Sequence, residues 1–503
     1  MAAHPDPERF AAEFSGTERT VAEYLLDEVL DNLPDEVRQF LLRTSVLERV
    51  NGPLADLLSG GSGGEQVLLE LEQANAFVVA LDARRSWFRY HHLFADLLQL
   101  GLRRTGLDEV RRLHSAAATW FAEHEYPVQA VGHAQAAGDW GLAVRLLSDH
   151  WFALWLSGEE VTAHALLAGF PSDLGVDDPE LAALVAADEL NPGSLAHADQ
   201  QLALATRRSA LVPADRREHV DALLAVVRLR LARQRTDLPA AVEEAQRLLA
   251  PLEPVATPRL GLGAELRTVA LLNLGVAELW KAEGARRLEQ ALALARQTQR
   301  PYLELGCLAN LALALVRRSF TAGFRASTQA VDLAQNHGWT EEPIVGVAYI
   351  AGGAVLVWQL HLDEAARWLG RAQRAFRAEL EPAQGLLLHR YRGMLELARG
   401  RDEEALAALR AAVRLEEFLA APHPHSHGSP HSFAAHSQAL MLQGMLRMGE
   451  TERVRQALME MDDGLRESPE MRKATAALLL AQNDPEAAAA VLEPVIDGSV
   501  PTA

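Results

Sequence analysis

Two stretches of the chain, GAVLVWQLHLDEAARWLGRA at residues 353–372 and GMLELARGRDEEALAALRAA at residues 393–412, share one spacing of small and apolar residues. Each begins with a glycine, and twelve residues later an alanine follows a turn, with a leucine four and an alanine seven positions beyond that alanine. Small residues let two helices approach closely, and apolar residues three to four positions apart share one helix face. The spacing therefore predicts one helical hairpin in each stretch.

Looser copies of this spacing occupy much of the chain. The residues that follow the turn run from Ala143 to Ala487 in nine copies. Their mean period is about 43 residues, longer than the roughly 34 residues of a tetratricopeptide repeat. Turn sequences such as GRD at residues 400–402 and NDP at residues 483–485 stand at the expected positions. Each hairpin has an apolar face that only its neighbours cover, so stacked hairpins form a superhelix with a concave surface. We therefore expect an all-α fold with a tetratricopeptide-like superhelix of helical hairpins over residues 106–503.

The first hundred residues have a different pattern. After a flexible tail at residues 1–16, an amphipathic helix is predicted for residues 17–31. The sequence LPDE at residues 33–36 starts a second helix, with acidic side chains in its first turn as the helix dipole favours. Asn51 and Gly52 begin a third short helix, and a glycine-rich break separates it from a fourth.

A β-hairpin is predicted after these helices. The segments FVVAL at residues 77–81 and WFRY at residues 87–90 are rich in β-branched and aromatic side chains and are joined by a short turn. His91 and His92 then lead into a further apolar helix. Helices followed by one small hairpin are typical of a winged helix, so we expect a small winged-helix-like domain over residues 17–105.

The charge balance argues against a nucleic-acid-binding surface. The 503 residues include 48 basic and 68 acidic side chains, which give a formal net charge of −20. Such a surface repels the phosphate backbone of DNA or RNA. We therefore expect no direct nucleic-acid contact by this chain.

The cysteine content and the longest uncharged stretch bear on location. Cys307 is the only cysteine, which excludes an internal disulfide framework and a cysteine-based zinc cluster and fits a reducing compartment. No signal peptide is visible at the N-terminus. The uncharged stretch from Pro343 to Leu362 is nearly long enough to span a bilayer, but it contains Gln359 and His361 and runs directly into acidic residues. We interpret it as a buried repeat helix and expect a cytoplasmic protein without membrane contact.

Four stretches of the sequence carry a family resemblance. The run FRYHHLFADLL at residues 88–98 resembles the segment that follows the nucleotide-binding module in MalT-like, LuxR-family ATP-dependent transcriptional regulators. The stretches at residues 133–140, 274–280 and 300–306 resemble the tetratricopeptide region of the same regulators. The resemblance extends over almost the whole chain in the family's order. It implies a winged-helix part followed by sensor repeats that bind an inducer.

Two hallmarks of those regulators are missing from the sequence. Members of the family carry an N-terminal P-loop ATPase domain and a C-terminal LuxR-type helix-turn-helix domain. The motif G-x-x-x-x-G-K followed by Ser or Thr occurs nowhere in this chain, and residues 60–64 lack the lysine that would reach a phosphate. Residues 501–503 follow a helix, with no basic recognition helix after it. We therefore expect the middle part of such a regulator, with no cofactor of its own and ATP only where a separate P-loop domain is supplied. Whether it is a truncated gene, a split gene product or an excised piece stays open.

The adjacent His91 and His92 have two interpretations. In related signal-transduction ATPases a winged-helix histidine contacts the phosphate of the bound nucleotide, so the resemblance implies that one of these two is a nucleotide-latch residue. The alternative, which we favour, is a corner between hairpin and helix where the imidazoles cap backbone groups. A latch would also need an ATPase-domain partner.

Aromatic and charged residues on the first helix of each hairpin are the candidate ligand-binding residues. Trp280 and Trp358 each lie five positions beyond the small residue of their hairpin, a position that tends to face the concave groove. Arg390 and Glu304 fall on the neighbouring register. Indole rings stack on sugars, rings or peptide side chains, and arginine pairs with anions. The alternative is that both tryptophans pack between helices.

A histidine-rich stretch is the one candidate for metal binding. Residues 422–431 contain four histidines, and His436 lies beyond them. Dense histidine binds Zn²⁺ or Ni²⁺. Prolines and a glycine, with no accompanying carboxylate or cysteine, instead favour a solvated loop, and we expect no metal site.

The sequence contains no motif for catalysis. Neither G-x-S-x-G nor H-E-x-x-H occurs, and acidic pairs stand at helix starts where the helix dipole explains them. We therefore predict no enzyme but a regulatory, signal-sensing fragment of a MalT-like LuxR-family transcriptional regulator. It would bind an inducer, a small molecule or a protein, in the concave groove of its repeats. The alternative is a stand-alone tetratricopeptide adaptor for protein–protein contacts, without a transcriptional role.

Overall fold

The chain divides into two compact units, which we describe separately. A computed structural model describes residues 33–74, 77–172, 174, 178–235, 237–249, 263–279, 282–375, 382–420 and 431–496. The N-terminal unit comprises residues 1–152 and 161–174, and the repeat unit comprises residues 153–160 and 175–503. The tail and helix expected at residues 1–31 lie outside the described residues. The domain boundaries expected at residues 16 and 105 stay predictions.

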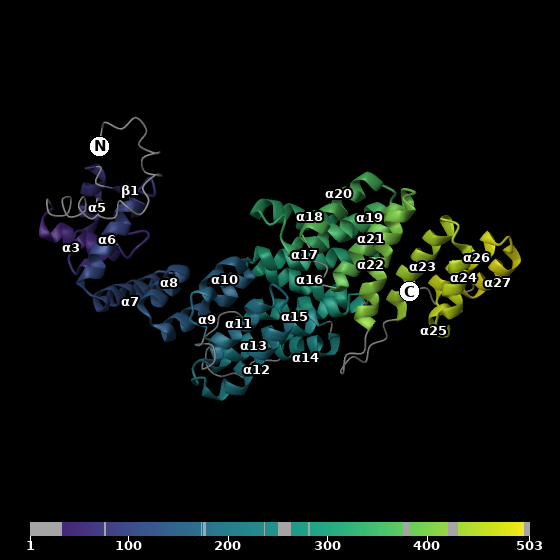
Figure 1. The fold of residues 1–503 in the computed structure, drawn as a ribbon, viewed down its shortest axis with the longest axis horizontal. Coiled ribbons are helices and arrows are strands. Elements are labelled where there is room, and N and C mark those ends of the chain that lie inside the picture. Colours follow the sequence, from purple (N-terminus) through teal and green to yellow (C-terminus); the bar gives the residue numbers. More distant parts are fainter. Residues whose placement is uncertain are drawn as a thin grey trace. The chain divides into compact units, whose positions relative to one another are not determined.

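The N-terminal unit contains short helices, one hairpin and two longer helical pairs (Figure 1). In chain order its elements are α3 (Asp35–Thr44), α4 (Gly52–Ser59), α5 (Gly64–Gln73), β1 (Val78–Ala80), β2 (Phe88–Tyr90), α6 (His92–Thr105), α7 (Leu107–Glu123), α8 (Pro127–Ala137), α9 (Trp140–Leu156) and α10 (Glu160–Ala168). Residues 153–156 at the end of α9, and Glu160, belong to the repeat unit.

The helix starts predicted near Pro34 and at Asn51 are confirmed. Pro34 precedes α3, whose first turn carries Asp35 and Glu36. Asn51 caps α4, and its side-chain Oδ1 accepts a hydrogen bond from the backbone N–H of Leu54 at 2.9 Å. Short polar residues favour such positions because they satisfy amide groups that the first turn leaves without a partner. Local chemistry therefore determines where these helices begin.

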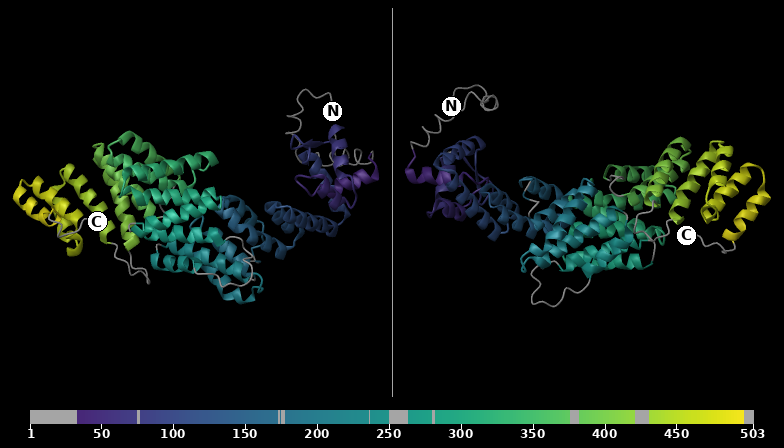
Figure 2. Two further views of the ribbon diagram at one scale, coloured as in Figure 1. Left: turned by 180° about the vertical axis from the view of Figure 1, so that it is seen from behind. Right: turned by 60° about the horizontal axis from the view of Figure 1, so that its bottom comes forward.

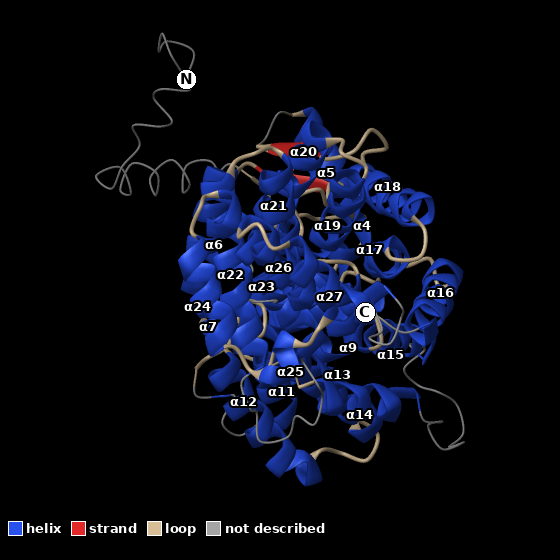
Figure 3. Ribbon diagram, turned by 90° about the vertical axis from the view of Figure 1, so that its right-hand side faces the viewer, coloured by secondary structure: helices blue, strands red, loops and turns tan. Residues whose placement is uncertain are grey.

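The predicted hairpin is also confirmed. The strands β1 and β2, red in Figure 3, pair antiparallel with Val79 opposite Arg89. Val50 exchanges two backbone hydrogen bonds of 2.8 Å with Phe88, so the segment before α4 adds a bridge to the outer side of β2. Phe88 is fully buried, and the hydroxyl of Tyr90 lies 2.6 Å from the Thr44 hydroxyl. The hairpin is thereby attached to the short helices, as in a winged helix.

The repeat unit consists of consecutive helical hairpins. Its elements are α11 (Pro179–Glu189), α12 (Leu195–Arg208), the 3₁₀ turn η2 (Ser209–Leu211), α13 (Arg217–Gln234), α14 (Leu238–Leu249), α15 (Gly263–Ala277), α16 (Ala282–Gln297), α17 (Pro301–Val316), α18 (Phe320–His337), α19 (Pro343–Trp358), α20 (Leu362–Ala375), α21 (Pro382–Ala398), α22 (Asp402–Ala420), α23 (His431–Arg447), α24 (Thr451–Glu460), α25 (Asp463–Arg466), α26 (Pro469–Ala481) and α27 (Pro485–Ile496). Within this unit each helix from α13 to α23 packs on the next (Figure 2).

The odd- and even-numbered helices of the unit form two layers. We call α13, α15, α17, α19 and α21 the A helices, and α14, α16, α18, α20 and α22 the B helices. The A helices α15, α17, α19 and α21 also contact one another in succession. α19 is buried over most of its length, whereas α20 buries only one face. This arrangement confirms the predicted all-α fold, in which stacked helical hairpins follow, along the chain, a small domain with one β-hairpin.

The glycines of the repeat spacing lie where the two helices of a hairpin cross. A Cβ atom at Gly353 would lie 2.6 Å from Cδ2 of Leu369, the leucine that the spacing places on the partner helix. A Cβ atom at Gly393 would collide in the same way with Leu409. The physical reason given for the spacing, close approach of the two helices, is therefore confirmed at both hairpins.

The uncharged stretch at residues 343–362 forms α19 and the turn after it. Its buried side chains pack against α17, α18, α20 and α21. In the described part of the chain, no helix combines the length and the low polarity needed to cross a bilayer.

Candidate ligand pocket on the A helices

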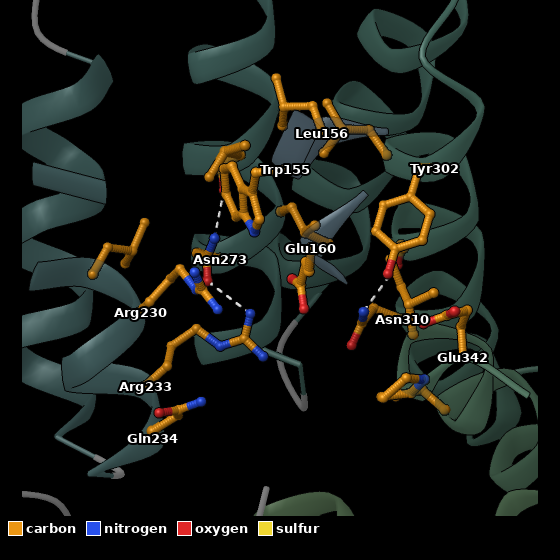
Figure 4. Close-up of a pocket in the computed structure, with 18 of the residues that line it drawn as sticks. Trp155, Leu156, Glu160, Arg230, Arg233, Gln234, Asn273, Tyr302, Asn310 and Glu342 are labelled. Carbon is orange, nitrogen blue, oxygen red and sulfur yellow. Dashed lines mark hydrogen bonds between the residues drawn. The ribbon is translucent and has the colours of Figure 1, made fainter. Parts of the chain in front are cut away.

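A cavity of about 250 Å³ lies within the repeat unit, on the A helices. Figure 4 shows it with Arg230 and Arg233 on one side, Tyr302 and Glu342 on the other, and Glu160 between them. The lining residues come from the end of α9, the first residue of α10, the helices α13, α15, α17, α19 and α21, and the loop before α19. They are Trp155, Leu156, Glu160, Leu229, Arg230, Arg233, Gln234, Val269, Leu272, Asn273, Tyr302, Leu303, Gly306, Asn310, Glu342, Pro343, Ile344, Val347 and Gln384.

Two arginines at the end of α13 form the basic side of the pocket. Arg230 donates to the backbone oxygen of Ala187 at 3.2 Å and to Oδ1 of Asn191 at 2.6 Å, and its guanidinium lies 5.5 Å from the ring centre of Trp155. Arg233 donates to Oδ1 of Asn273 at 3.1 Å. These contacts fix both guanidinium groups in place, so the positive charge at this side is preorganised.

Four amide side chains also line the cavity. Nδ2 of Asn273 donates to the backbone oxygen of Val269 at 2.7 Å, and Nδ2 of Asn310 donates to that of Gly306 at 2.9 Å. Gln234 donates to the backbone oxygen of Leu190 at 2.9 Å. Oε1 of Gln234 and Oε1 of Gln384 are buried and accept no hydrogen bond from the described residues. A buried oxygen without a hydrogen bond destabilises the folded state, and a ligand that donates a hydrogen bond to it would remove this cost.

The acidic side of the pocket consists of Glu160, Glu342 and the ring of Tyr302. Burial, and then the negative charge of Glu160, raise the pKa of the Glu342 carboxyl above its usual value. Burial, with the charges of Glu160 and Glu342, raises the pKa of the Tyr302 hydroxyl. Burial and the negative charge of Glu160 thus both disfavour the charged form of Glu342.

A glycine brings the loop before α10 against Tyr302. Gly158 has a φ of 77°, and a Cβ atom there would lie 2.6 Å from Cε2 of the Tyr302 ring. Only a residue without a side chain suits both the backbone conformation and the close contact. The loop can therefore place Glu160 beside the ring.

The structure places the predicted ligand-binding residues at other points of the unit. Trp280 lies outside the described residues. Trp358 is the last residue of α19 and is 52% exposed. Glu304 on α17 accepts a hydrogen bond from Arg296 at 2.7 Å. Arg390 is buried on α21. The last three lie on A helices, but none of them lines the pocket, and their ligand role stays a prediction.

Arg390 belongs to a closed polar group that we call the Arg390 cluster, formed by Arg390, Glu416 and Ser437. Nε of Arg390 donates to the Ser437 hydroxyl at 3.2 Å, and one of its terminal nitrogens donates to Glu416 Oε1 at 3.4 Å. All three side chains are buried, and burial raises the pKa of Glu416 to about 7. Helix α23 contributes Ser437 and covers this part of α21. The arginine thus pairs with an internal carboxylate.

His91 and His92 lie at the start of α6 with exposed side chains. Their rings stand 4.4 Å apart, and the backbone N–H of His91 donates to the Phe77 carbonyl at 2.8 Å. The side chain of His91 makes no capping hydrogen bond to α6. The expected capping of α6 by the His91 side chain is therefore not found, and its ring lies beside that of His92. The nucleotide-latch role stays a prediction.

Most of the histidine-rich stretch lies outside the described residues, which resume at His431. The pKa of His436 on α23 is lowered to about 4, mainly by burial. Among the described side chains, no three histidines, cysteines or carboxylates come together as metal ligands would.

Sequence reasoning missed the pocket residues, although one signal pointed to them. Asn273 and Asn310 are single polar residues within the apolar runs VALLNLGVA and LANLALALV. A polar side chain inside a buried helix needs a partner, so its presence there calls for an explanation. Tyr302 also lies in the run at residues 300–306 that carries the family resemblance.

Comparison with known proteins agrees with the resemblance found in the sequence. Residues 26–110 match the family model of the MalT winged helix domain. A segment of 172 residues is 38% identical to the serine/threonine-protein kinase PknK of Mycobacterium tuberculosis, and covers 34% of this chain and 16% of the kinase. A segment of 166 residues is 39% identical to the HTH-type transcriptional regulator MalT of Yersinia pestis, and covers 33% of this chain and 18% of the regulator.

A solved structure shows the same fold over nearly the whole chain. It is a signal transduction ATPase with numerous domains from Pyrococcus horikoshii, which has a tetratricopeptide repeat sensor. The TM-score is 0.50 at 14% sequence identity, and the match covers 94% of this chain and 66% of that protein. Residues 26–110 are thus similar to the MalT winged helix domain, and the chain resembles the part of a MalT-like regulator in which this domain precedes tetratricopeptide-type repeats.

Proposed function

We propose that this chain is the signal-sensing part of a MalT-like, LuxR-family transcriptional regulator and that it binds a small-molecule inducer in the pocket of the A helices. The observation that carries the proposal is the pocket itself. It combines charges of both signs, two aromatic rings and two buried amide oxygens that accept no hydrogen bond from the described residues. Concave sites with a few fixed polar groups are typical of small-molecule binding.

The size of the cavity favours a small ligand over a folded partner. Its volume of about 250 Å³ is slightly below the roughly 300–1,000 Å³ of sites for drug-sized molecules. A protein partner would instead need a contact area of several hundred Å² on this chain. The pocket therefore supports an inducer more directly than it supports the adaptor function.

The relatives support an input role for this part of the chain. One is named a protein kinase and the other a transcriptional regulator, and each matches about a third of this chain and less than a fifth of its own length. A segment shared by proteins with different outputs fits sensing or relay better than either output. We therefore propose that the chain catalyses no reaction and that an ATPase domain, where present, receives its signal.

The winged-helix domain is the proposed relay. Arg49, next to the bridge residue Val50, has its guanidinium 4.8 Å from the ring centre of Trp87 and 4.6 Å from that of Tyr126. This stack joins the hairpin to the loop between α7 and α8, within the N-terminal unit. The exposed His91 and His92 are available on the same domain for a nucleotide held by an ATPase-domain partner.

A thermal-shift experiment tests the inducer proposal. The purified chain is heated with the small-molecule fraction of a cell extract, and we expect a higher melting temperature because a ligand that binds only the folded state stabilises it. Asn310→Phe, which adds bulk in the pocket, should abolish the shift. Asn336→Phe, the same change at an exposed position of α18, should keep it.

Two outcomes would contradict this function. If the extract stabilises neither the wild type nor Asn336→Phe, or stabilises the wild type, Asn310→Phe and Asn336→Phe equally, the pocket is not the sensor site. The alternative function as a protein–protein adaptor is then favoured. Titration with ATP and with duplex DNA at physiological salt should show binding of neither, and micromolar affinity for ATP would overturn the proposed lack of a nucleotide site.

A further inference from the structure

We infer that the pocket of the A helices takes a small amphoteric molecule, a free amino acid or a short peptide, with its ammonium group at Glu160 and Glu342 and its carboxylate at Arg230 and Arg233. This inference rests on the proposed function and adds the class of ligand to it. It follows from the charges, the amide oxygens and the size of the cavity.

Charges of both signs line the pocket. Arg230 and Arg233 come from the last two turns of α13, whereas Glu342 directly precedes α19 and Glu160 lies between the two sides (Figure 4). Two positive and two negative groups around one cavity are complementary to a ligand that carries one group of each sign. An anion such as phosphate would meet two carboxylates, and a simple cation would meet two guanidinium groups.

The carboxyl pair is suited to an ammonium group. Glu342 titrates at a raised pKa because it is buried and because Glu160 repels its charge. A cation bound between the two groups would remove that repulsion and stabilise both charged forms. An ammonium group also has three N–H donors for the carboxylate oxygens.

The arginine side is suited to a carboxylate. The guanidinium of Arg230 is supported from Asn191 and stacked on Trp155, and that of Arg233 is supported from Asn273. Planar guanidinium groups held in place bind carboxylates more specifically than a flexible ammonium side chain does.

The buried amide oxygens favour a ligand with N–H donors. Oε1 of Gln234 lies on the basic side, at the end of α13, and Oε1 of Gln384 belongs to α21. Each accepts nothing from the described residues. Peptide or side-chain N–H groups of an amphoteric ligand would satisfy them.

The test is a binding panel on the full chain. The probes are the free amino acids and a set of dipeptides at millimolar concentration, with maltose and inorganic phosphate as ligands of other chemistry. We expect one or more free amino acids or dipeptides to raise the melting temperature. Acetylating the amino group or amidating the carboxyl group of that probe should each weaken binding about ten- to hundredfold, the effect of losing one charge-assisted contact.

Matched variants locate the two ends of the ligand. Arg233→Met and Glu342→Gln should each weaken binding of the free probe. Arg235→Met and Glu341→Gln, at exposed positions one or two residues away, should leave it unchanged. Glu342→Gln should also reduce the penalty for acetylating the amino group, because the partner of that group is already gone. Circular dichroism of each variant checks that the helices are intact.

The amphoteric ligand is overturned if no free amino acid or dipeptide binds, if blocked probes bind as well as free ones, or if only maltose or phosphate stabilises the chain. Should the cell-extract fraction still stabilise the wild type and fail with Asn310→Phe, the sensor function stands and only the ligand class is wrong. If neither the panel nor the extract has an effect, both proposals fail.

Discussion

Two groups of polar side chains in the repeat unit contain the same residue types but differ in what surrounds them. In the pocket, Arg233 and Glu342 line a cavity, and Oε1 of Gln234 and Oε1 of Gln384 accept no hydrogen bond from the described residues. In the Arg390 cluster, the arginine contacts one oxygen of a buried carboxylate directly, α23 covers both side chains, and the other oxygen of Glu416 accepts no hydrogen bond from the described residues. The difference teaches that an arginine on an A helix indicates a ligand site only where the neighbouring helices leave a cavity beside it.

The two regions should respond differently to loss of their arginine. Arg390→Met removes the partner of a buried carboxylate, and breaking a buried ion pair in this way costs about 3–5 kcal/mol. Arg233→Met removes the hydrogen bond to Asn273 beside a cavity and should cost less, about 1 kcal/mol. Urea unfolding of the two variants measures the difference. Equal losses in the free energy of unfolding would mean that Arg233 is as tightly enclosed by neighbouring side chains as Arg390.

The Arg390 cluster should depend on the close crossing of α21 and α22. Gly393→Ala forces a Cβ atom against the side chain of Leu409, so this side chain or the two helices, which carry Arg390 and Glu416, must shift. We expect a loss of about 1–3 kcal/mol in the free energy of unfolding, typical of overpacking. Gly370→Ala is the control: its Cβ atom meets no atom within 4 Å, and better helix propensity should stabilise the chain by up to about 1 kcal/mol. A loss at Gly370 as large as that at Gly393 would refute the crossing as the cause.

The closed cluster should also be visible in the pH dependence of stability. The pKa of Glu416 rises from 4.5 to about 7 on folding, so between these values the unfolded chain releases a proton that the folded chain keeps. This group therefore lowers the free energy of unfolding as the pH rises from about 4.5 to 7. His436, with its pKa lowered from 6.5 to about 4, acts in the opposite sense and lowers stability as the pH falls through that range.

Glu416→Gln separates the two contributions. The variant should lose the decline in stability toward pH 7 and keep the decline on acidification that His436 causes. Urea unfolding of the variant and the wild type at a series of pH values measures this difference. A constant difference across the series would show that Glu416 titrates normally and that the cluster is solvated.

The smallest effect is expected at the acidic side of the pocket. Glu342→Gln replaces a half-buried carboxyl by an amide of the same shape and should change the free energy of unfolding by less than about 0.5 kcal/mol. Glu341→Gln, at the exposed neighbour, gives the background for comparison. A loss of several kcal/mol at Glu342 would place it in a structural network like the Arg390 cluster.

The sequence predicts the elements of this protein better than the directions of its side chains. The cap at Asn51, the hairpin before His91 and the Gly353–Leu369 crossing all follow from residues close in the chain or from a fixed spacing. Whether Arg390 faces a groove depends on α23, which supplies Ser437 from 47 residues away. Arg233 is likewise held by Asn273, 40 residues away on another A helix.

The repeat period therefore predicted the helical hairpins and which of their helices should line a groove, but it did not show which helix faces meet the cavity. Rotation of each helix about its axis is set by packing against helices on both sides, which a spacing rule does not contain. The single asparagines in apolar runs are the sequence feature that carries this information, because buried amides occur where something polar is nearby.

Hydrogen–deuterium exchange of the full chain, with and without the small-molecule fraction of a cell extract, tests the central claim most directly. If the pocket of the A helices is the sensor site, the fraction should slow exchange in α13, α15, α17 and the start of α19, with little change in α22 and α23 around the Arg390 cluster. Slower exchange confined to α21–α23, or no change anywhere in the repeat unit, would contradict the account.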